Sequence, residues 1–453
     1  MSGDIGTSDI SFSNIVTAYN NIYTPDLPTT NISLSIFRDK SFANGSSIPS
    51  TGAISIFSNF RGKTWGSSVS ETKLLASDGA SGDLFGSSVS ISSDGLTAIV
   101  GAWGDDDNGS SSGSAYIFKY ANGEWTETKL TADDGASDDN FGRFLSITGD
   151  GLTAIVGAFK DDSNKGSAYI FEYANGSWTQ TKLLASDGAS GDYFGSSVSI
   201  SSDGLTAIVG AYFDDSRKGS AYIFKYANGS WTETKLLASD GAIYDYFGSS
   251  VSISSDGLTA IVGAYSDVEN GSRSGSAYIF KYANGVWSQT EELLASDGAT
   301  YDNFGYSVSI SSDGLTAIVG AYGDDDNGSS SGSAYIFEYA NGSWTQTKLL
   351  ASDGASSDNF GRSVSISGDG LTAIVGAYGD DDNGSSSGSA YIFKYANGSW
   401  TETTKLLASD GASGDNFGNS VSISSDGLTI IVGAYSDVEN GSRSGSAYIY
   451  NYL

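Results

Sequence analysis

Short segments in which hydrophobic residues alternate with small or polar residues recur along most of the chain. In Phe85–Ser92 the hydrophobic side chains fall on one side and serine and glycine on the other, which predicts a strand in a crowded position. Leu96–Ala102 is hydrophobic on both sides, which predicts a strand covered on both faces. Ser114–Tyr120 has an aromatic residue at every second position, and Trp125–Leu130 includes alternating charged residues, as suits an outer edge. The pattern therefore predicts four consecutive strands.

The same group of segments occurs seven times. A Phe-Gly pair marks each copy at intervals of 53 to 57 residues, and Ala-Ile-Val-Gly-Ala, or Ile-Ile-Val-Gly-Ala in the last copy, then leads to an aromatic residue. Periods of about 50 residues with four strands each are typical of β-propeller blades. The sequence therefore predicts an all-β fold, a seven-bladed β-propeller of four-stranded blades. The phenylalanines of the seven pairs are Phe85, Phe141, Phe194, Phe247, Phe304, Phe360 and Phe417.

The two ends of the repeat region complement each other. The chain ends at Leu453 in a third-strand segment with no fourth strand after it, whereas residues 69–75 match the fourth-strand segments of later copies. An incomplete blade would leave a strand edge open to aggregation. We therefore predict that residues 69–75 pair with residues 445–452 and close the ring. The predicted domains are an N-terminal arm, residues 1–63, and the propeller, residues 64–453.

The Phe-Gly and Gly-Ala-aromatic pairs resemble the FG-GAP repeats of integrin α-subunit propellers, and the Gly-Ser-Ala-Tyr-Ile-Phe endings resemble bacterial and viral forms of that repeat more closely. The resemblance covers about residues 69–453. Integrin repeats often hold calcium in an aspartate-rich loop between the first and second strands. One aspartate in each such turn here cannot supply the six to eight oxygen ligands of calcium, so that site is not expected. The turn aspartates are Asp94, Asp150, Asp203, Asp256, Asp313, Asp369 and Asp426.

The N-terminal arm has a short repeat of its own. Residues 10–15, 32–37 and 54–60 share alternating isoleucine and serine, which predicts β-rich segments. The phrase Ser-Thr-Gly-Ala-Ile-Ser-Ile-Phe-Ser-Asn-Phe-Arg-Gly-Lys resembles N-terminal segments of virion structural proteins from tailed phages and large marine DNA viruses. The resemblance implies an arm that docks on other virion proteins; a flexible leader without a partner is the alternative. The expected anchoring residues are Ile32, Leu34, Phe37, Ile54, Ile56, Phe60, Arg61 and Lys63.

Charge and composition narrow the functional classes. The formal net charge is −31, while the arm holds four acidic and four basic residues, so the repeats carry the excess. A surface this acidic repels phosphates, so we expect no nucleic-acid partner. The sequence has no run of about 18 apolar residues, so we expect no membrane insertion. The chain contains no Cys and no His, which excludes Ser-His-Asp, Cys-His and His-metal sites and argues against an enzyme.

Long acidic loops are expected on one face of the propeller. Strand parity places the loops after the fourth and second strands on the same side, and aspartates crowd in both. With help from carbonyl groups they would offer enough oxygens for calcium, although their spacing matches no established loop; otherwise they are solvated turn residues. No cofactor is required. The candidate calcium ligands are Asp78, Asp83, Asp105, Asp106, Asp107, Asp297, Asp302, Asp324, Asp325, Asp326, Asp353, Asp358, Asp380, Asp381 and Asp382.

The same loops carry residues that differ between blades. Aromatic side chains beside Asp and Asn are typical of many glycan-binding sites, and loops on a rigid scaffold usually carry function. Each residue taken alone also fits ordinary packing within the blades. The candidate ligand-binding residues are Trp103, Phe159, Tyr244, Tyr246, Tyr301 and Arg362.

Two functional hypotheses follow, with an enzyme as a third. The first is a non-enzymatic virion surface protein, such as a fibre, decoration or receptor-binding component, and therefore extracellular. Its arm would bind other virion proteins, and its acidic face would bind a host glycan or protein. The alternative is a bacterial secreted or cell-surface adhesion protein with an integrin-like propeller. An enzyme is least expected because the acidic residues recur in the blades instead of marking one of them.

Overall fold

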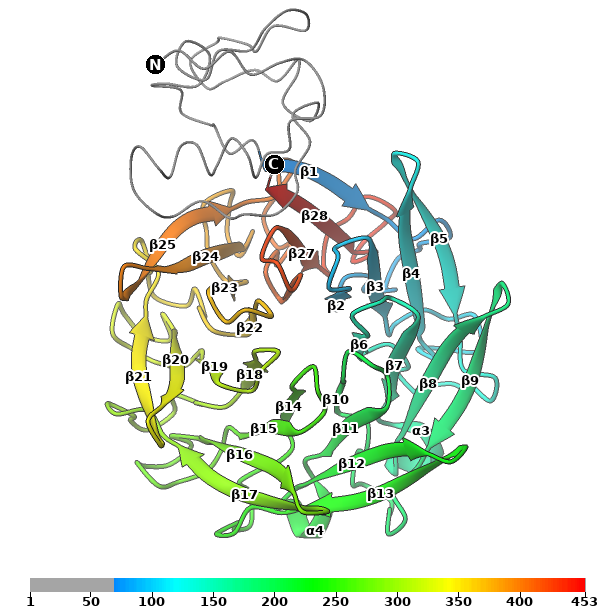
Figure 1. Ribbon diagram of the computed structural model, residues 1–453. Coiled ribbons are helices and arrows are strands. Elements are labelled where there is room, and N and C mark those ends of the chain that lie inside the picture. Colours follow the sequence, from blue (N-terminus) through cyan, green and yellow to red (C-terminus); the bar gives the residue numbers. More distant parts are fainter. Residues whose placement is uncertain (1–68, 453) are drawn as a thin grey trace, which may run out of the picture. The chain divides into compact units, whose positions relative to one another are not determined.

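The structure is a computed structural model that describes residues 69–452. Seven four-stranded antiparallel sheets surround a central axis (Figure 1). This arrangement confirms the predicted all-β, seven-bladed propeller. The arm, residues 1–63, lies outside the described residues. Its β-rich character, its boundary and its anchoring residues therefore stay predictions.

Each blade is built from the axis outward, and blades are numbered here from the one that contains β2. The strands nearest the axis are β2 (Ser88–Ile91), β6 (Phe144–Ile147), β10 (Ser197–Ile200), β14 (Ser250–Ile253), β18 (Ser307–Ile310), β22 (Ser363–Ile366) and β26 (Ser420–Ile423). The second strands are β3 (Thr97–Ala102), β7 (Thr153–Ala158), β11 (Thr206–Ala211), β15 (Thr259–Ala264), β19 (Thr316–Ala321), β23 (Thr372–Ala377) and β27 (Thr429–Ala434).

The outer half of each blade follows the same order. The third strands are β4 (Ser114–Ala121), β8 (Ser167–Ala174), β12 (Ser220–Ala227), β16 (Ser276–Ala283), β20 (Ser333–Ala340), β24 (Ser389–Ala396) and β28 (Ser446–Tyr452). The outer strands are β5 (Glu124–Leu130), β9 (Ser177–Leu183), β13 (Ser230–Leu236), β17 (Val286–Leu293), β21 (Ser343–Leu349), β25 (Ser399–Leu406) and, for blade seven, β1 (Val69–Leu74).

The hydrophobic core lies between neighbouring blades. Phe85 and Tyr116 of blade one are buried and belong to one cluster with Ile431 and Ile449 of blade seven. The Phe85 ring meets the rings of Tyr116 and Phe118 edge-on, with centroids 5.4 and 5.9 Å apart. Edge-on aromatic pairs add to the free energy gained by burying their area. The alternating pattern of the inner and third strands therefore explains how the blades pack on each other.

Two recurrent glycines allow neighbouring blades to touch. A Cβ on Gly101, in β3, would meet the carbonyl oxygen of Gly142, which opens the next blade. Gly142 has φ = 86°, and a Cβ on it would meet the carbonyl oxygen of Ser114. Its N–H donates to the carbonyl of Gly157 at 3.1 Å. The Phe-Gly and Gly-Ala pairs are thus two halves of one close backbone contact that glycine permits.

The segment before blade one completes blade seven. β1 pairs with β28 in the order β1-β28-β27-β26, which confirms the predicted closure, and Figure 1 shows the blue β1 beside the red β28. The hydroxyl of Tyr450 donates to Glu71 at 3.0 Å. Phe85 forms a parallel bridge with Gly445, so blade one is also attached to blade seven. The ring is therefore closed by backbone and side-chain contacts.

Some local details differ from the sequence prediction. The predicted strand Phe85–Ser92 is too long, because the N–H of Phe85 donates to Ser444 of the neighbouring blade at 3.0 Å and Gly86 turns the chain with φ = 87°. Single turns, α3 (Asp161–Asn164) and α4 (Asp214–Arg217), follow the second strands of blades two and three, and in each turn the residues after the first have positive φ. Among the described helices, none is long and apolar enough to cross a membrane.

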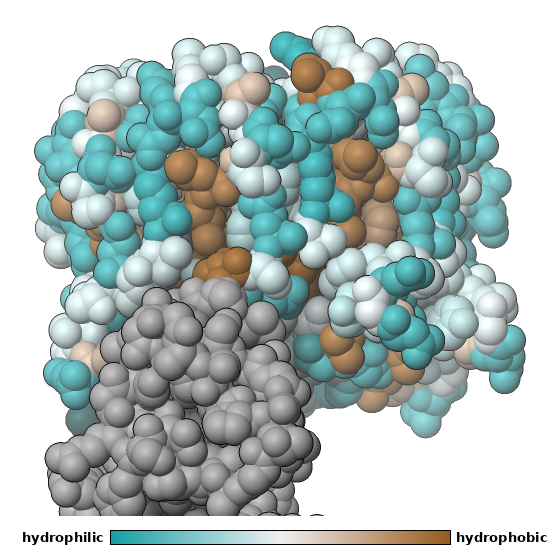
Figure 2. Space-filling view, turned by 90° about the horizontal axis from the view of Figure 1, so that it is seen from above, coloured by the Kyte–Doolittle hydropathy of each residue, from teal (hydrophilic) through white to brown (hydrophobic). Residues whose placement is uncertain are grey.

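The outer rim is largely hydrophilic. Figure 2, seen from above the view of Figure 1, shows broad teal areas with separate brown hydrophobic patches. In β5 exposed and half-buried residues alternate up to a buried last residue. Charged and polar side chains on such an edge disfavour pairing with the edge of another sheet.

Candidate functional site

Loops from adjacent strands meet on one side of the ring. The N–H of Asp138, between β5 and β6, donates to the carbonyl of Ser110, between β3 and β4, at 2.8 Å. The N–H of Gly104 likewise donates to the carbonyl of Asp83 at 3.1 Å. These contacts place the two families of long loops together, as strand parity predicts. We call this side the loop face: it comprises the loops that follow the outer strands and the second strands.

A lysine lies among the loop-face carboxylates of blade one. The Nζ of Lys129, in β5, lies 2.7 Å from Asp78, 2.9 Å from Asp105 and 2.6 Å from Asp107. The hydroxyl of Tyr116 lies 2.9 Å from Asp78 and 3.0 Å from Asp105. The outer strand therefore supplies the cation that holds two acidic loops together. The equivalent lysines of other blades are Lys182, Lys235, Lys348, Lys405 and Lys73.

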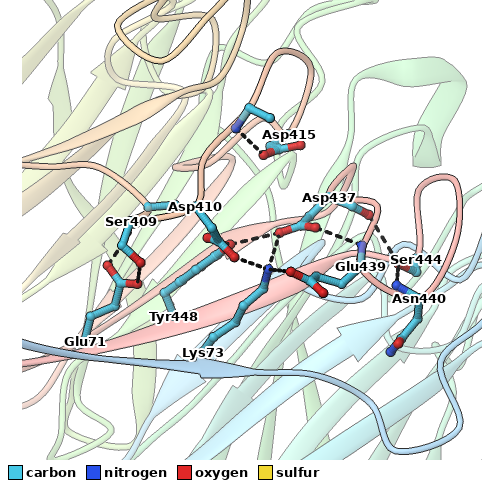
Figure 3. Close-up of polar contacts among 12 residues, drawn as sticks. Glu71, Lys73, Ser409, Asp410, Asp415, Asp437, Glu439, Asn440, Ser444 and Tyr448 are labelled. Atoms are coloured by element: carbon cyan, nitrogen blue, oxygen red, sulfur yellow. Dashed lines mark hydrogen bonds and ion pairs between the residues drawn. The ribbon is translucent and has the colours of Figure 1, made fainter.

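Blade seven takes its lysine from the ring-closing strand β1 (Figure 3). The Nζ of Lys73 lies 2.6 Å from Asp410, 2.9 Å from Asp437 and 3.1 Å from Glu439. The hydroxyl of Tyr448 lies 2.8 Å from Asp410 and 2.9 Å from Asp437. Closing the ring therefore also completes the lysine cluster of blade seven.

The carboxylates of these clusters lie close enough together to bind a calcium ion, but a lysine already contacts them. Asp78, Asp105 and Asp107 bring carboxylate oxygens within 4.8 Å of one another, as an ion would require. The ammonium of Lys129 already contacts all three. Burial alone would lower the pKa of Lys129, but its hydrogen bonds to these aspartates raise it, so the ammonium stays charged. The donor set therefore fits calcium only when the lysine moves away, and calcium binding stays a prediction.

The remaining predicted calcium ligands bond to the loop backbone. Asp83 accepts a hydrogen bond from the N–H of Ala80 at 2.6 Å, and Asp106 accepts one from Ser111 at 2.7 Å. Such bonds stabilise turns, which is the alternative that the sequence left open. Blades five and six divide in the same way: Asp297, Asp324, Asp326, Asp353, Asp380 and Asp382 surround a lysine, whereas Asp302, Asp325, Asp358 and Asp381 accept backbone N–H groups.

Blade four has a glutamate where the other blades have the lysine. β17 places Glu292 opposite Tyr278, the register position that Lys129 occupies in blade one. Burial, reinforced by the charges of Asp240 and Asp267, raises the pKa of Glu292 to about 7. Blade four thus collects carboxyl groups that repel one another where its neighbours form ion pairs.

Aromatic side chains form a continuous arc on the loop face. Successive ring centroids, from blade two to blade five, lie 4.5 to 6.1 Å apart, and each ring is partly exposed. Burial and the neighbouring Tyr193 raise the pKa of Tyr212 to about 12, so its hydroxyl stays neutral near pH 7. The aromatic arc comprises Phe144, Phe159, Tyr193, Tyr212, Phe213, Tyr246, Tyr265, Tyr306 and Tyr322.

An arginine lies at each end of the aromatic arc. The Arg143 guanidinium lies 5.9 Å from the ring centroid of Phe144 and 4.8 Å from that of Trp103. The Arg362 guanidinium lies 4.3 Å from the ring centroid of Tyr306 and 5.2 Å from that of Tyr322. Within residues 69–452 the ion pairs are all made by lysines, so neither arginine has a carboxylate partner there. Burial, and also the charge of Arg362, lower the pKa of Arg143.

Both arginines line a cavity on the axis, and Arg443 lines it as well. Its volume is about 510 Å³, and its walls come from inner strands of the blades together with Trp103, Tyr306 and Tyr435. A cavity of about 400 Å³ on the outer rim is lined by residues that recur between blades, such as Trp231. The axial cavity is lined both by the recurrent serines and valines of the inner strands and by residues that distinguish the blades, such as Arg143, Tyr306 and Arg362. We therefore take it as the candidate binding site.

The candidate ligand-binding residues occupy different places on the loop face. Trp103 and Arg362 line the axial cavity, and Phe159 and Tyr246 belong to the aromatic arc. Two of the six predicted residues therefore line the axial cavity, and two others belong to the aromatic arc.

Two predicted residues lie away from that cavity. Tyr244 and Tyr301 are 53% and 58% exposed on the loops before blades four and five. Arg143, Phe144 and Tyr306 line the cavity but were not predicted. Arg143 and Tyr306 directly follow the Phe-Gly pairs of their repeats, and Phe144 comes one residue later; blades one, three and four have serine directly after the pair. Comparing the repeats at that position would have found Arg143 and Tyr306.

Seven segments of the chain match the FG-GAP repeat: residues 68–118, 125–171, 178–224, 231–280, 287–337, 344–393 and 400–450. The chain belongs to the FG-GAP repeat family. The predicted resemblance to this repeat is thereby confirmed. Each FG-GAP segment runs from an outer strand through the next inner, second and third strands, so it is offset by one strand from a blade. The offset explains why an FG-GAP propeller closes with a strand from before blade one.

The fold of this FG-GAP propeller is similar to a solved structure of Kuenenia stuttgartiensis hydrazine synthase. The identity is 14% and the TM-score 0.53, over 80% of this chain and 94% of that chain. A likeness at this identity shows the fold alone. No curated protein sequence matches the chain.

Proposed function

We propose that this FG-GAP propeller is a non-enzymatic recognition protein of a virion surface. It is a fibre, decoration or receptor-binding component that its N-terminal arm anchors to other virion proteins. Its loop face binds a glycan or protein of the host surface. FG-GAP propellers are typical of adhesion and recognition modules, which supports the recognition role.

The axial cavity is the observation that best supports a recognition role. Concave sites lined by aromatic groups, with a few convergent polar groups, are the usual form of ligand sites. Arg143 and Arg362 line this cavity together with rings of the aromatic arc. The cluster lysines recur in six blades as structural ion pairs, whereas the cavity adds to the recurrent inner-strand serines and valines some residues that vary between blades, such as Arg143, Tyr306 and Arg362. The varied residues are therefore the ones available to determine a ligand.

The resemblance of residues 50–63 to virion structural proteins supports the virion location. The test is fractionation of the source material on a density gradient, followed by immunogold labelling with antibodies against the propeller. The chain should sediment with particles and label their surface, and deleting residues 1–63 should prevent incorporation while the propeller still folds. Labelling of a bacterial envelope, with particles unlabelled, would instead support the alternative, a bacterial adhesion protein.

A further inference from the structure

We propose that the axial cavity binds an acidic oligosaccharide, with a carboxylate held by Arg143 and Arg362 and sugar rings resting on the aromatic arc. This inference rests on the proposed recognition function and adds the chemical class of the ligand. It also assigns roles to residues that differ between blades.

The charge distribution favours an anionic group in the cavity. Arg143 and Arg362 have no ion-pair partner within residues 69–452, although the chain carries a net charge of −31. Burial and their mutual repulsion lower the pKa of Arg143, and a bound anion would relieve that repulsion. A guanidinium binds a carboxylate through two parallel hydrogen bonds. The most favourable occupant therefore has a carboxylate at this point.

The acidic residues of the loop face disfavour a ligand with many closely spaced negative charges. Aspartates such as Asp106 and Asp138 are exposed on the loop face. They repel a polyphosphate backbone, whose charges are closely spaced. A saccharide with one carboxylate per sugar or per few sugars places its charge at the arginines and leaves neutral hydroxyl groups near the aspartates, which accept hydrogen bonds from them.

The aromatic arc favours sugar rings. Its partly exposed rings form a curved strip from Phe144 to Tyr322 with centroids 4.5 to 6.1 Å apart. Aromatic faces carry a partial negative charge and attract the weakly positive C–H faces of pyranose rings. Neutral tyrosine hydroxyls, such as that of Tyr212, remain hydrogen-bond donors at neutral pH. The arc thus combines apolar and polar contacts along the length of several sugar units.

The inner strands disfavour a peptide that adds a strand. At the axis the N–H of Ile147 is hydrogen bonded to the Ser90 hydroxyl of the neighbouring blade at 3.2 Å, and Ile310 is bonded in the same way to Ser252 at 3.3 Å. Strand addition needs backbone groups that are free to pair. Because serines already occupy these N–H groups, the cavity offers side-chain chemistry and not a strand edge.

The inference is tested with the full chain and a panel of acidic oligosaccharides. The panel contains hyaluronan and oligomannuronate hexasaccharides and sialyllactose, each beside the same compound with its carboxylates reduced to alcohols. Titration calorimetry should show that at least one acidic compound binds. Reduction of its carboxylates should weaken its affinity tenfold or more, because the reduced compound lacks the charged hydrogen bonds to the arginines. If no acidic compound binds more tightly than its reduced form, the inference is wrong.

Variants locate the binding site. Arg143→Met and Arg362→Met should each weaken binding by about tenfold to a hundredfold, and Arg143→Lys should weaken it less, because a point charge remains without the paired donors. Arg273→Met is the matched control, since Arg273 also lies over an aromatic ring, that of Tyr301 at 6.0 Å, but does not line the cavity, and Tyr301 does not belong to the aromatic arc. Equal loss in the control, or no loss in the first two variants, would overturn the inference.

The outcomes also separate this inference from the proposed function. If an acidic compound binds in a way that depends on Arg143 but the chain is absent from particles, the virion role is refuted and the proposed ligand class is supported. If antibodies against the chain label particles but the chain binds no acidic compound of the panel, the virion role is supported and the proposed ligand class is refuted. Unchanged melting temperatures of the variants show that loss of binding does not come from unfolding.

Discussion

Replacing Glu292 by lysine should stabilise the propeller. The change gives blade four the ammonium that six other blades already have among their loop-face carboxylates. In the folded state, burial and the charges of Asp240 and Asp267 raise the pKa of Glu292 from its ordinary 4.5 to about 7. Because the folded pKa is the higher one, the folded state holds the proton more tightly, and stability falls as the pH rises through this window.

The size of the effect follows from that pKa. A difference of 2.5, from 4.5 to about 7, corresponds to about 3.4 kcal/mol at 1.36 kcal/mol per unit. Glu292 is partly exposed, so solvent screening leaves about half, roughly 1.5 to 2 kcal/mol. The new ion pairs add about 0.5 to 1 kcal/mol. At roughly 2.1 cal/mol/K per residue of unfolding entropy, residues 69–452 should gain about 3 °C in Tm at pH 8.

The assay is thermal unfolding by calorimetry at pH 5 and pH 8. The Tm difference between Glu292→Lys and the natural chain should be largest at pH 8, where Glu292 is ionised, and smaller at pH 5, where it is protonated. Glu291→Lys is the matched control: it makes the same change of charge at the exposed neighbouring residue, and we expect little change. A lower Tm for Glu292→Lys at pH 8, or a difference independent of pH, would refute the reasoning.

Two further predictions concern the blade contacts and the lysine clusters. Gly142→Ala should destabilise the chain by about 2 to 5 kcal/mol in urea unfolding, because φ = 86° and the carbonyl of Ser114 both oppose a Cβ. The control Gly123→Ala, with φ = 91° and nothing within 4 Å of the new Cβ, should cost about 1 to 2 kcal/mol. Equal losses of stability in the two variants would contradict the close contact at Gly142. Lys348→Met leaves Asp297, Asp324 and Asp326 without their cation, so calcium should raise the Tm of this variant more than that of the natural chain; an equal response would show that the lysine does not occupy a cation position.

The fold was predictable because its signals are local and repeated. Alternation in segments such as Phe85–Ser92 marks each strand, and the Phe-Gly and Gly-Ala pairs report a backbone contact that glycine permits. Residues 69–75 repeat the sequence of an outer strand, so the ring closure followed from counting strands. The start of the inner strand was wrong, because Phe85 bonds to a neighbouring blade before its own strand begins, and the turns α3 and α4 were not predicted.

The chemistry of the loop face was less predictable because it joins distant segments. Asp78, Asp105 and Lys129 come from two loops and a strand, and their meeting depends on strand register, which composition does not reveal. The exchange of lysine for Glu292 can be read from the sequence, because Glu292 precedes Leu293 as Lys348 precedes Leu349, but its position opposite Tyr278 depends on the register of β16 and β17. Arg362 was recognised as individual to its blade, but its approach to Arg143 in one cavity depends on the packing of the whole ring.

The closed ring is the central claim, because the axial cavity exists only if seven inner strands surround one axis. Hydrogen exchange of the full chain, read at the amides of β1 and β28, tests it most directly. Protection of Val69–Leu74 equal to that of the outer strand Glu124–Leu130 is the result predicted by the pairing of β1 with β28. Rapid exchange across Val69–Leu74, while the other outer strands remain protected, would contradict it.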